Sequence, residues 1–142
     1  MLNKQSIQAL ISSQNKDAGL HQSFFVNKEV FDLSCKALFQ KQWIFVTHIS
    51  YFKENSKLIY NLNEGHIEII KLENGNLDVR HSIESVPCHL KVYESLIFVN
   101  LSNEPFSFDE FIKPLEPYMK IHGLDEGKIA FQKEYIFNAS HM

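Results

Sequence analysis

The residue types that could bind a metal come closest together in one short stretch of the chain. Cys88 is followed directly by His89, and His81 stands a few positions before them. A thiolate and two imidazoles are suitable ligands for zinc. Structural zinc sites usually need four ligands, however, and this spacing matches no zinc-finger pattern. We therefore predict a shortened loop with ordinary surface histidines and no metal site, with His81, Cys88 and His89 as the residues on which that prediction depends.

Sequence signatures of nucleophilic and phosphate chemistry are missing. Neither Gly-x-Ser-x-Gly, the nucleophile turn of many hydrolases, nor Gly-x-Gly-x-x-Gly, a phosphate-binding loop, occurs in the sequence. Cys35 falls at a helical core position and is expected to be a small apolar side chain, because reactive thiols need an electropositive, partly exposed setting. The acidic pairs at 109–110 and 125–126 suit a helix start and a turn. We predict no catalytic and no cofactor-binding residue.

Composition limits the classes of partner. The 142 residues suffice for one domain. A net charge of -3 argues against a nucleic-acid-binding surface, because phosphate neutralisation needs clustered Lys and Arg. The longest apolar runs, at 43–46 and 96–99, are far shorter than the roughly 20 residues that span a bilayer, and the first residues lack a signal-peptide layout. We expect a cytoplasmic protein with reduced thiols and neither a nucleic-acid nor a membrane partner.

Residues 1–42 are predicted to form a helical arm. Apolar residues recur at helical spacing in 5–13, and a second helix is expected to start at Asn27, which can cap it, and to run to about Gln42. Between them, an extended arm or loop ends in Phe24 and Phe25. Aromatic residues are enriched at interfaces, so these two are the candidate interface residues.

Residues 43–142 are predicted to form a β scaffold. The Asn-Gly pair at 74–75 tolerates positive φ in a tight hairpin, and Glu94-Ser95 marks a second hairpin with poorer turn chemistry. The expected strands are short runs rich in β-branched and aromatic residues, at 43–48, 57–62, 66–72, 77–83, 89–93 and 96–101.

A short helix and a last strand are expected to follow these strands. Ser107 and Glu110 form a capping box, and Phe106 and Phe111 can staple it. Prolines at 114 and 117 limit this helix. Alternating apolar residues then predict a long strand over 129–137. The chain is therefore predicted to be a single domain, residues 1–142, that is mainly antiparallel β.

Several segments carry a resemblance to a known family. The sequences LHQSFFVNKEVFD at 20–32 and LFQKQWIFVTH at 38–48 resemble the entry segment of Rieske-type non-haem iron oxygenase α subunits. The similarity is greatest to the branch that acts on glycine betaine and related quaternary ammonium compounds. KVYESLIFVNLSNEP at 91–105 resembles the family's strand pair after the cluster loops. Three later segments resemble the family elements that follow this strand pair, at 111–118, 123–129 and 134–139.

The resemblance implies a Rieske-like antiparallel β-sandwich, but the family's cofactor motifs are absent. The [2Fe–2S] cluster of the family is held by one Cys-x-His and one Cys-x-x-His loop, and neither motif occurs here. The chain passes through 84–87 straight into the later strand pair, so the cluster-binding lobe is missing. In the family, a mononuclear iron bound by two histidines and a carboxylate lies in a following domain. We expect neither iron site in this chain.

These observations lead to a hypothesis and two alternatives. The hypothesis is a cluster-less Rieske-like domain that acts as a non-catalytic binding or assembly module, associating with a second copy or with an oxygenase-type subunit. The first alternative is a fragment of a Rieske-type oxygenase for quaternary ammonium or aromatic substrates, whose iron sites lie in missing sequence or in a partner chain. The second is an unidentified small-molecule site in the space left by the missing lobe.

Overall fold

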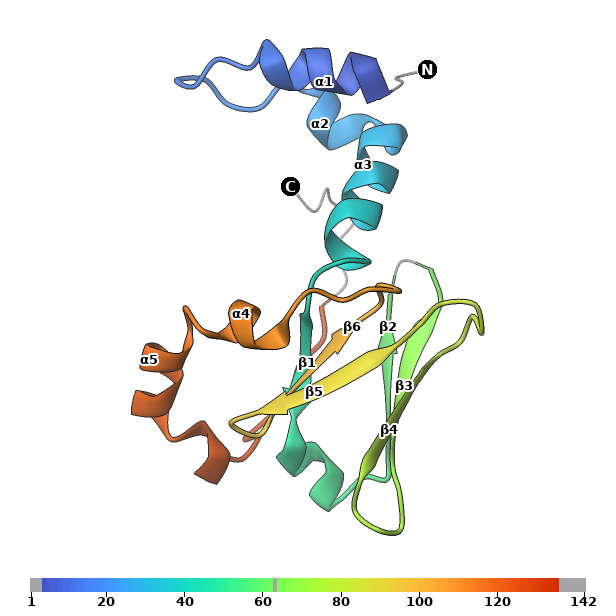
Figure 1. Cartoon of the computed structure of the whole chain (residues 1–142), viewed down its shortest axis with the longest axis vertical. Helices are drawn as coiled ribbons and strands as arrows, with labels where there is room; N and C mark the ends of the chain where they lie inside the picture. The colour runs from blue at the N-terminus through green and yellow to red at the C-terminus, as the bar shows by residue number, and fades with distance from the viewer. Residues whose placement is uncertain (1–3, 63, 136–142) are drawn as a thin grey trace. The chain divides into compact units, whose positions relative to one another are not determined.

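The structure is a computed structural model that describes residues 4–62 and 64–135. The chain divides into two compact units (Figure 1). One comprises Met1–Leu38 together with Lys133–Met142, and the other comprises Phe39–Gln132. In the part of the chain that is described, every strand belongs to the second unit, and no helix is long and apolar enough to cross a bilayer.

The first unit is helical where it is described. It contains α1 (Lys4–Ser12), α2 (Ser23–Val26) and α3 (Lys28–Ser34), and a π-helical turn, η1 (Cys35–Phe39), continues α3. The Asn27 side chain accepts hydrogen bonds from the backbone N–H groups of Glu29 and Val30 at 2.9 and 3.1 Å, which confirms the predicted cap. The helical run ends at Phe39 and not at Gln42.

The expected extended arm before Asn27 is partly wrong, because α2 is a helical turn. The backbone N–H groups of Phe24 and Phe25 donate to the carbonyls of His21 and Gln22, both at 2.9 Å. The His21 ring adds a local cap, since its Nδ1 accepts the Ser23 N–H at 3.2 Å. These local hydrogen bonds close a turn that the apolar pattern did not indicate.

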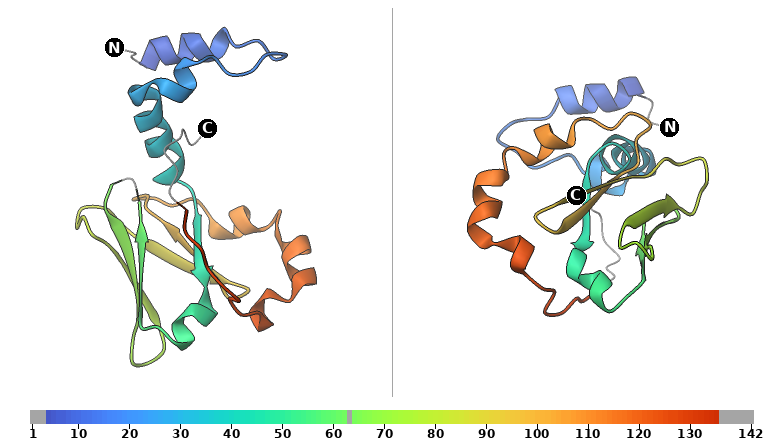
Figure 2. Two further views of the ribbon diagram at one scale, coloured as in Figure 1. Left: turned by 180° about the vertical axis from the view of Figure 1, so that it is seen from behind. Right: turned by 60° about the horizontal axis from the view of Figure 1, so that its bottom comes forward.

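The second unit is a sandwich of two antiparallel three-stranded sheets (Figure 2). One sheet has the order β1-β6-β5 and the other β2-β3-β4. This confirms the predicted mainly β fold and places all six expected strands within a few residues of their predicted bounds. The strands are β1 (Ile44–His48), β2 (Lys57–Asn61), β3 (His66–Lys71), β4 (Leu77–His81), β5 (His89–Tyr93) and β6 (Leu96–Asn100).

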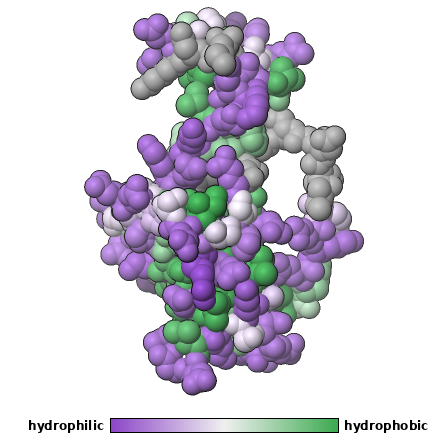
Figure 3. Space-filling model, turned by 90° about the vertical axis from the view of Figure 1, so that its right-hand side faces the viewer, coloured by the Kyte–Doolittle hydropathy of each residue, from purple (hydrophilic) through white to green (hydrophobic). Residues whose placement is uncertain are grey.

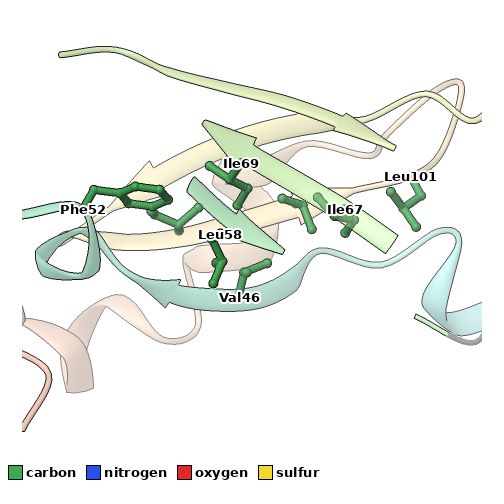
Figure 4. Close-up of a cluster of buried hydrophobic side chains, with 8 residues drawn as sticks. Val46, Phe52, Leu58, Ile67, Ile69 and Leu101 are labelled. Atoms are coloured by element: carbon green, nitrogen blue, oxygen red, sulfur yellow. The ribbon is translucent and has the colours of Figure 1, made fainter. Parts of the chain in front are cut away.

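Strand alternation builds the core between the two sheets. Every second residue of a strand faces the same side, so Ile67 and Ile69 of β3 and Ile97 and Val99 of β6 turn inward and are fully buried. Figure 4 shows the resulting cluster of aliphatic and aromatic side chains between the sheets. Its buried members are Val46, Phe52, Leu58, Ile67, Ile69, Ile97, Val99 and Leu101.

Both predicted hairpins form, although their turns differ in chemistry. Gly75 has a φ of +84°, the left-handed conformation for which glycine is suited. Glu94 and Ser95 adopt φ values of 47° and 64° without that freedom. The pair lies between the matched residues Tyr93 and Leu96, so the strand register imposes a two-residue loop that requires positive φ.

Helices cover the outer face of the β1-β6-β5 sheet. Trp43 is buried there against Phe98 of β6 and Phe108 of α4 (Phe108–Ile112), and its Nε1 donates to the Phe106 carbonyl at 3.1 Å. The Ser107 hydroxyl accepts the Glu110 N–H at 3.3 Å, which confirms the predicted cap. Short helical turns complete the unit: η2 (Ile49–Lys53), α5 (Glu116–Met119), η3 (Lys120–His122) and η4 (Leu124–Glu126).

The predicted last strand is wrong over its described part. Residues 129–135 form no strand, and positions 136 and 137 of the prediction lie outside the described residues. An alternating pattern makes a strand only where a neighbouring edge hydrogen-bonds to it and a core covers its apolar face. Here the Ile129 N–H donates to a side chain, Ser50 Oγ, and the Phe131 side chain is 84% exposed.

Candidate functional site

The three candidate ligands lie at the end of β4 and the start of β5, and the two imidazoles serve local contacts. The expected surface position is wrong for His81, which is buried beside Ile67, its strand partner, and whose Nδ1 accepts the Ile83 N–H at 3.0 Å. His89 is half-buried, and its Nε2 lies 3.0 Å from the Ser102 carbonyl, to which it can donate a hydrogen bond. The first contact fixes the backbone just after β4, and the second joins the start of β5 to the segment after β6.

The His81 ring also packs against the turn between β2 and β3. Gly65 in this turn has a φ of +78°, and a Cβ atom there would lie 2.9 Å from His81 Cε1 and 2.5 Å from Ser82 Oγ. The His66 N–H donates to the same Ser82 hydroxyl at 2.9 Å. The turn is therefore closed tightly over the histidine, as in a packed structural contact.

Cys88 packs against the sandwich core as a half-buried free thiol. Burial raises the pKa of this thiol from 9.0 to about 11. The thiolate is the form that attacks electrophiles, so a thiol that stays protonated at neutral pH reacts slowly as a nucleophile. The environment of Cys88 resembles that of a core residue.

We predict that native Cys88 alkylates slowly. In a Cys35→Ser variant, iodoacetamide at pH 8 is expected to modify Cys88 about 10- to 100-fold more slowly in the native protein than in urea, because the raised pKa lowers the thiolate population. Mass spectrometry of quenched samples measures both rates. Equal rates in the two states would show that the thiol is neither buried nor held protonated.

Charged side chains form a ladder on the outer face of the β2-β3-β4 sheet. Glu68 of β3 accepts a hydrogen bond from Lys57 at 2.9 Å and lies 3.4 Å from His66 Nε2 and 3.8 Å from Arg80 Nε. The Lys57 hydrogen bond, followed by that of His66, lowers the pKa of Glu68 against the opposing effect of desolvation. Because the pKa of Glu68 is lower in the folded state, its ionised carboxylate stabilises the fold at pH values above the pKa of the unfolded chain. This stabilisation is lost as the pH falls through the pKa of the folded state. The arrangement is a surface network that pairs neighbouring strands.

A second polar feature lies under the outer helices, at Tyr93 of β5. Its hydroxyl is buried close to the carboxylate of Glu116 in α5. Burial, followed by the negative charges of Glu116 and Glu94, raises the pKa of this phenol. The phenol therefore stays protonated at neutral pH.

A polar network that the sequence analysis did not anticipate lies at the end of β1. The His48 ring bridges Ser50, two positions ahead, and the Leu124 carbonyl, to which it is joined by a 2.8 Å contact across 76 positions. Only the position of His48 in a family-like segment marked it in the sequence. No local pattern shows which distant carbonyl an imidazole will reach.

Comparison with known proteins supports the fold. No protein-family model matches the chain, and no curated protein matches it. Among solved structures, it is similar to the quaternary ammonium Rieske monooxygenase CntA, solved in complex with an inhibitor, with a TM-score of 0.60 and 15% identity. The match covers 72% of this chain and 44% of that one, so this chain spans less than half the length of that protein. At this identity the likeness shows a Rieske-like β-sandwich.

The contacts of the candidate ligands bear on whether the described residues could hold a Rieske cluster. Such a cluster needs two thiolates and two imidazoles around one pair of irons. Cys88 packs against the sandwich core, and His81 and His89 make the hydrogen bonds described above. Within 4–62 and 64–135, no three His, Cys, Asp or Glu side chains gather as a metal-ligand group.

The candidate interface residues lie on α2 in the helical unit. Phe24 is half-buried, whereas the Phe25 side chain is 41% exposed. An exposed aromatic side chain on a short helical turn is compatible with an interface. Their role in association stays a prediction.

Proposed function

We propose that this chain is a non-catalytic binding or assembly module built on a Rieske-like sandwich. The observation that carries the proposal is that the scaffold is closed by its own side chains at the point where the resemblance leads one to expect a cluster lobe. His81 is buried beside Ile67, and Cys88 packs against the core that the two sheets share. The candidate ligands thus act as scaffold.

The segment that joins β4 to β5 supports this proposal. Its chain turns tightly, since the Val86 N–H donates to the Ile83 carbonyl at 3.0 Å. Val86 and Cys88 then pack against the same core cluster as the strands. A short link that contributes to the core therefore joins β4 to β5, the end strands of the two sheets.

Exposed apolar side chains support an association role. Several lie on strands or beside them in the sandwich unit, and hydrophobic areas appear among the hydrophilic side chains in Figure 3. Exposed apolar side chains on a folded domain are compatible with a site of association. We propose a second copy or an oxygenase-type subunit as the partner. The large exposed residues on or beside the strands include Phe45, Ile49, Ile59, Ile83 and Val92.

The test is metal analysis of protein purified without oxygen. We expect no stoichiometric iron or acid-labile sulfide and no paramagnetic signal after reduction, because the described side chains provide no ligand set. Light scattering on the same sample is expected to show association with itself or, after mixing, with a partner subunit. A stoichiometric cluster signal would overturn the proposal, and so would a compact monomer that captures no partner.

A second candidate function rests on the covered length in the structural comparison. The match takes up 44% of the CntA chain, as a piece of a longer oxygenase would. On this reading the chain is a fragment of a Rieske-type oxygenase acting on quaternary ammonium or aromatic substrates, and its iron sites lie elsewhere. The DNA that follows the codon for Met142 discriminates, because this alternative needs a continuation that encodes two histidines and a carboxylate for mononuclear iron.

A further inference from the structure

The segment that follows α5 is tied to the end of β1 by side chains from two different parts of the sandwich. His48 Nε2 lies 2.8 Å from the Leu124 carbonyl, and the Ile129 N–H donates to Ser50 Oγ at 3.0 Å. A longer contact of 3.4 Å joins Ser95 Oγ to the carbonyl of Asp125. Residues 124–129 are thereby held at both ends by the pair His48 and Ser50.

One protonation pattern satisfies all of these contacts together. His48 Nδ1 lies 3.1 Å from the Ser50 backbone nitrogen and 2.9 Å from its hydroxyl, so it accepts from both. The ring proton then sits on Nε2, where it can be donated to the Leu124 carbonyl. The Ser50 hydroxyl, donating to the ring, keeps a lone pair for the Ile129 N–H. Each hydrogen bond fixes the donor or acceptor role of the next.

Apolar burial adds little to this attachment. Leu124 and Ile129 are half-buried, whereas Ile121 before them and Phe131 after them are 81% and 84% exposed. The turn between the two attachment points is tight at the histidine, since a Cβ on Gly127 would lie 3.0 Å from the Leu124 carbonyl oxygen and 3.9 Å from His48 Nε2. The polar contacts are therefore the main link between this segment and the sheet.

The segment then continues beside an edge strand. β1 has β6 as its one neighbour in its sheet, and Figures 1 and 2 draw residues 128–132 beside β1. In 129–132 the backbone forms no ladder with that strand. A segment that has few apolar contacts and no ladder can open locally while the core stays folded.

We propose that His48 and Ser50 form a releasable latch that holds residues 124–129 as a strap at the end of β1. When the latch opens, the strap leaves as a unit and uncovers the outer edge of β1, while the two sheets stay packed. His48 is a positioning residue in this device, because it acts through the carbonyl and the hydroxyl that it orients. The proposal does not depend on the proposed function of the chain.

The test uses a variant that breaks the latch and keeps the local cap. His48 also caps η2 by accepting the Ser50 N–H. In His48→Asn the shorter side chain can still accept that N–H but cannot reach the Leu124 carbonyl. Hydrogen–deuterium exchange read by mass spectrometry is expected to be about tenfold faster in a peptide over 124–132, because one latch hydrogen bond is lost. Exchange in β6 is expected to be unchanged.

A second variant and a matched control keep the test decisive. Ser50→Ala removes the acceptor of the Ile129 N–H and is expected to accelerate the same peptide by a similar factor. Asn55→Ala is the control, since Asn55 follows η2 and donates to the Tyr51 carbonyl without contacting the strap. Unchanged exchange over 124–132 in both latch variants would overturn the proposal. Equal acceleration in β6 would do so too, because the strap would then open only with the whole sandwich.

Discussion

Replacing Ile67 with Ala is expected to lower the free energy of unfolding by about 3–4 kcal/mol, the range for a large aliphatic side chain removed from a rigid core. Ile67 is fully buried on the inner face of β3, where its strand partners are Tyr60 of β2 and His81 of β4. The central strand cannot move inward without breaking both ladders, so most of the vacated volume stays empty. Urea unfolding followed by circular dichroism measures the loss.

The matched control is Ile59→Ala, which removes the same atoms from the opposite face of the same sheet. The Ile59 side chain is 52% exposed, so its truncation is expected to cost less than about 1 kcal/mol. A similar loss for both variants would mean that the two faces of the β2-β3-β4 sheet are not distinguished, and that the cavity between the sheets is not where the structure places it.

The predictable part of the fold is the part that local chemistry determines. A two-residue alternation aligns Ile67 with Ile69 on one face, and a one-residue slip would turn both to solvent, so the sequence specifies the register of β3 strongly. The caps at Asn27 and Ser107 could also be predicted, because each side-chain oxygen accepts hydrogen bonds from backbone N–H groups no more than three positions away. Such features need no knowledge of distant segments.

The features that were missed depend on partners far away in the sequence or on weak local signals. The alternating pattern after Ile129 resembles that of the strands, but a strand also needs an edge to pair with, and Ile129 instead finds the Ser50 hydroxyl. At α2 the His21 ring accepts a hydrogen bond from the Ser23 N–H, a cap that the sequence pattern does not predict. For Glu94 and Ser95, strand pairing on both sides overrides unfavourable turn chemistry.

The candidate site shows the same limit. Cys88 and His89 are adjacent in sequence and His81 is near them, which made these three residues the candidate metal ligands. In a strand, however, successive side chains point to opposite faces, so neighbours in sequence need not meet. His81 faces the core, while the His89 ring reaches Ser102, beyond the end of β6. By contrast, the His48 network joins residues that no spacing rule connects. Its signal in the sequence is a histidine at the end of a strand, which by itself is common and unspecific.

The second large effect is expected at Asn100, the one fully buried polar side chain at the end of β6. Its Nδ2 donates to the Lys41 carbonyl at 3.0 Å and its Oδ1 accepts the Ser102 N–H at 2.8 Å, so it ties the chain before β1 to the chain after β6. Asn100→Ala leaves both groups without their partner and creates a small cavity. We expect a loss of about 2–3 kcal/mol in the free energy of unfolding.

Asn55→Ala is the matched control for this prediction, because Asn55 makes the same kind of hydrogen bond in solvent. Its Nδ2 donates to the Tyr51 carbonyl, also at 3.0 Å, but water can replace it there, so a change below about 0.5 kcal/mol is expected. Both variants are compared by urea unfolding at constant pH. If Asn100→Ala were as mild as the control, water would have to reach Lys41 and Ser102 in the native state. The junction between the start of β1 and the end of β6 would then be open to solvent, and the closed scaffold on which the proposed function rests would lose its support.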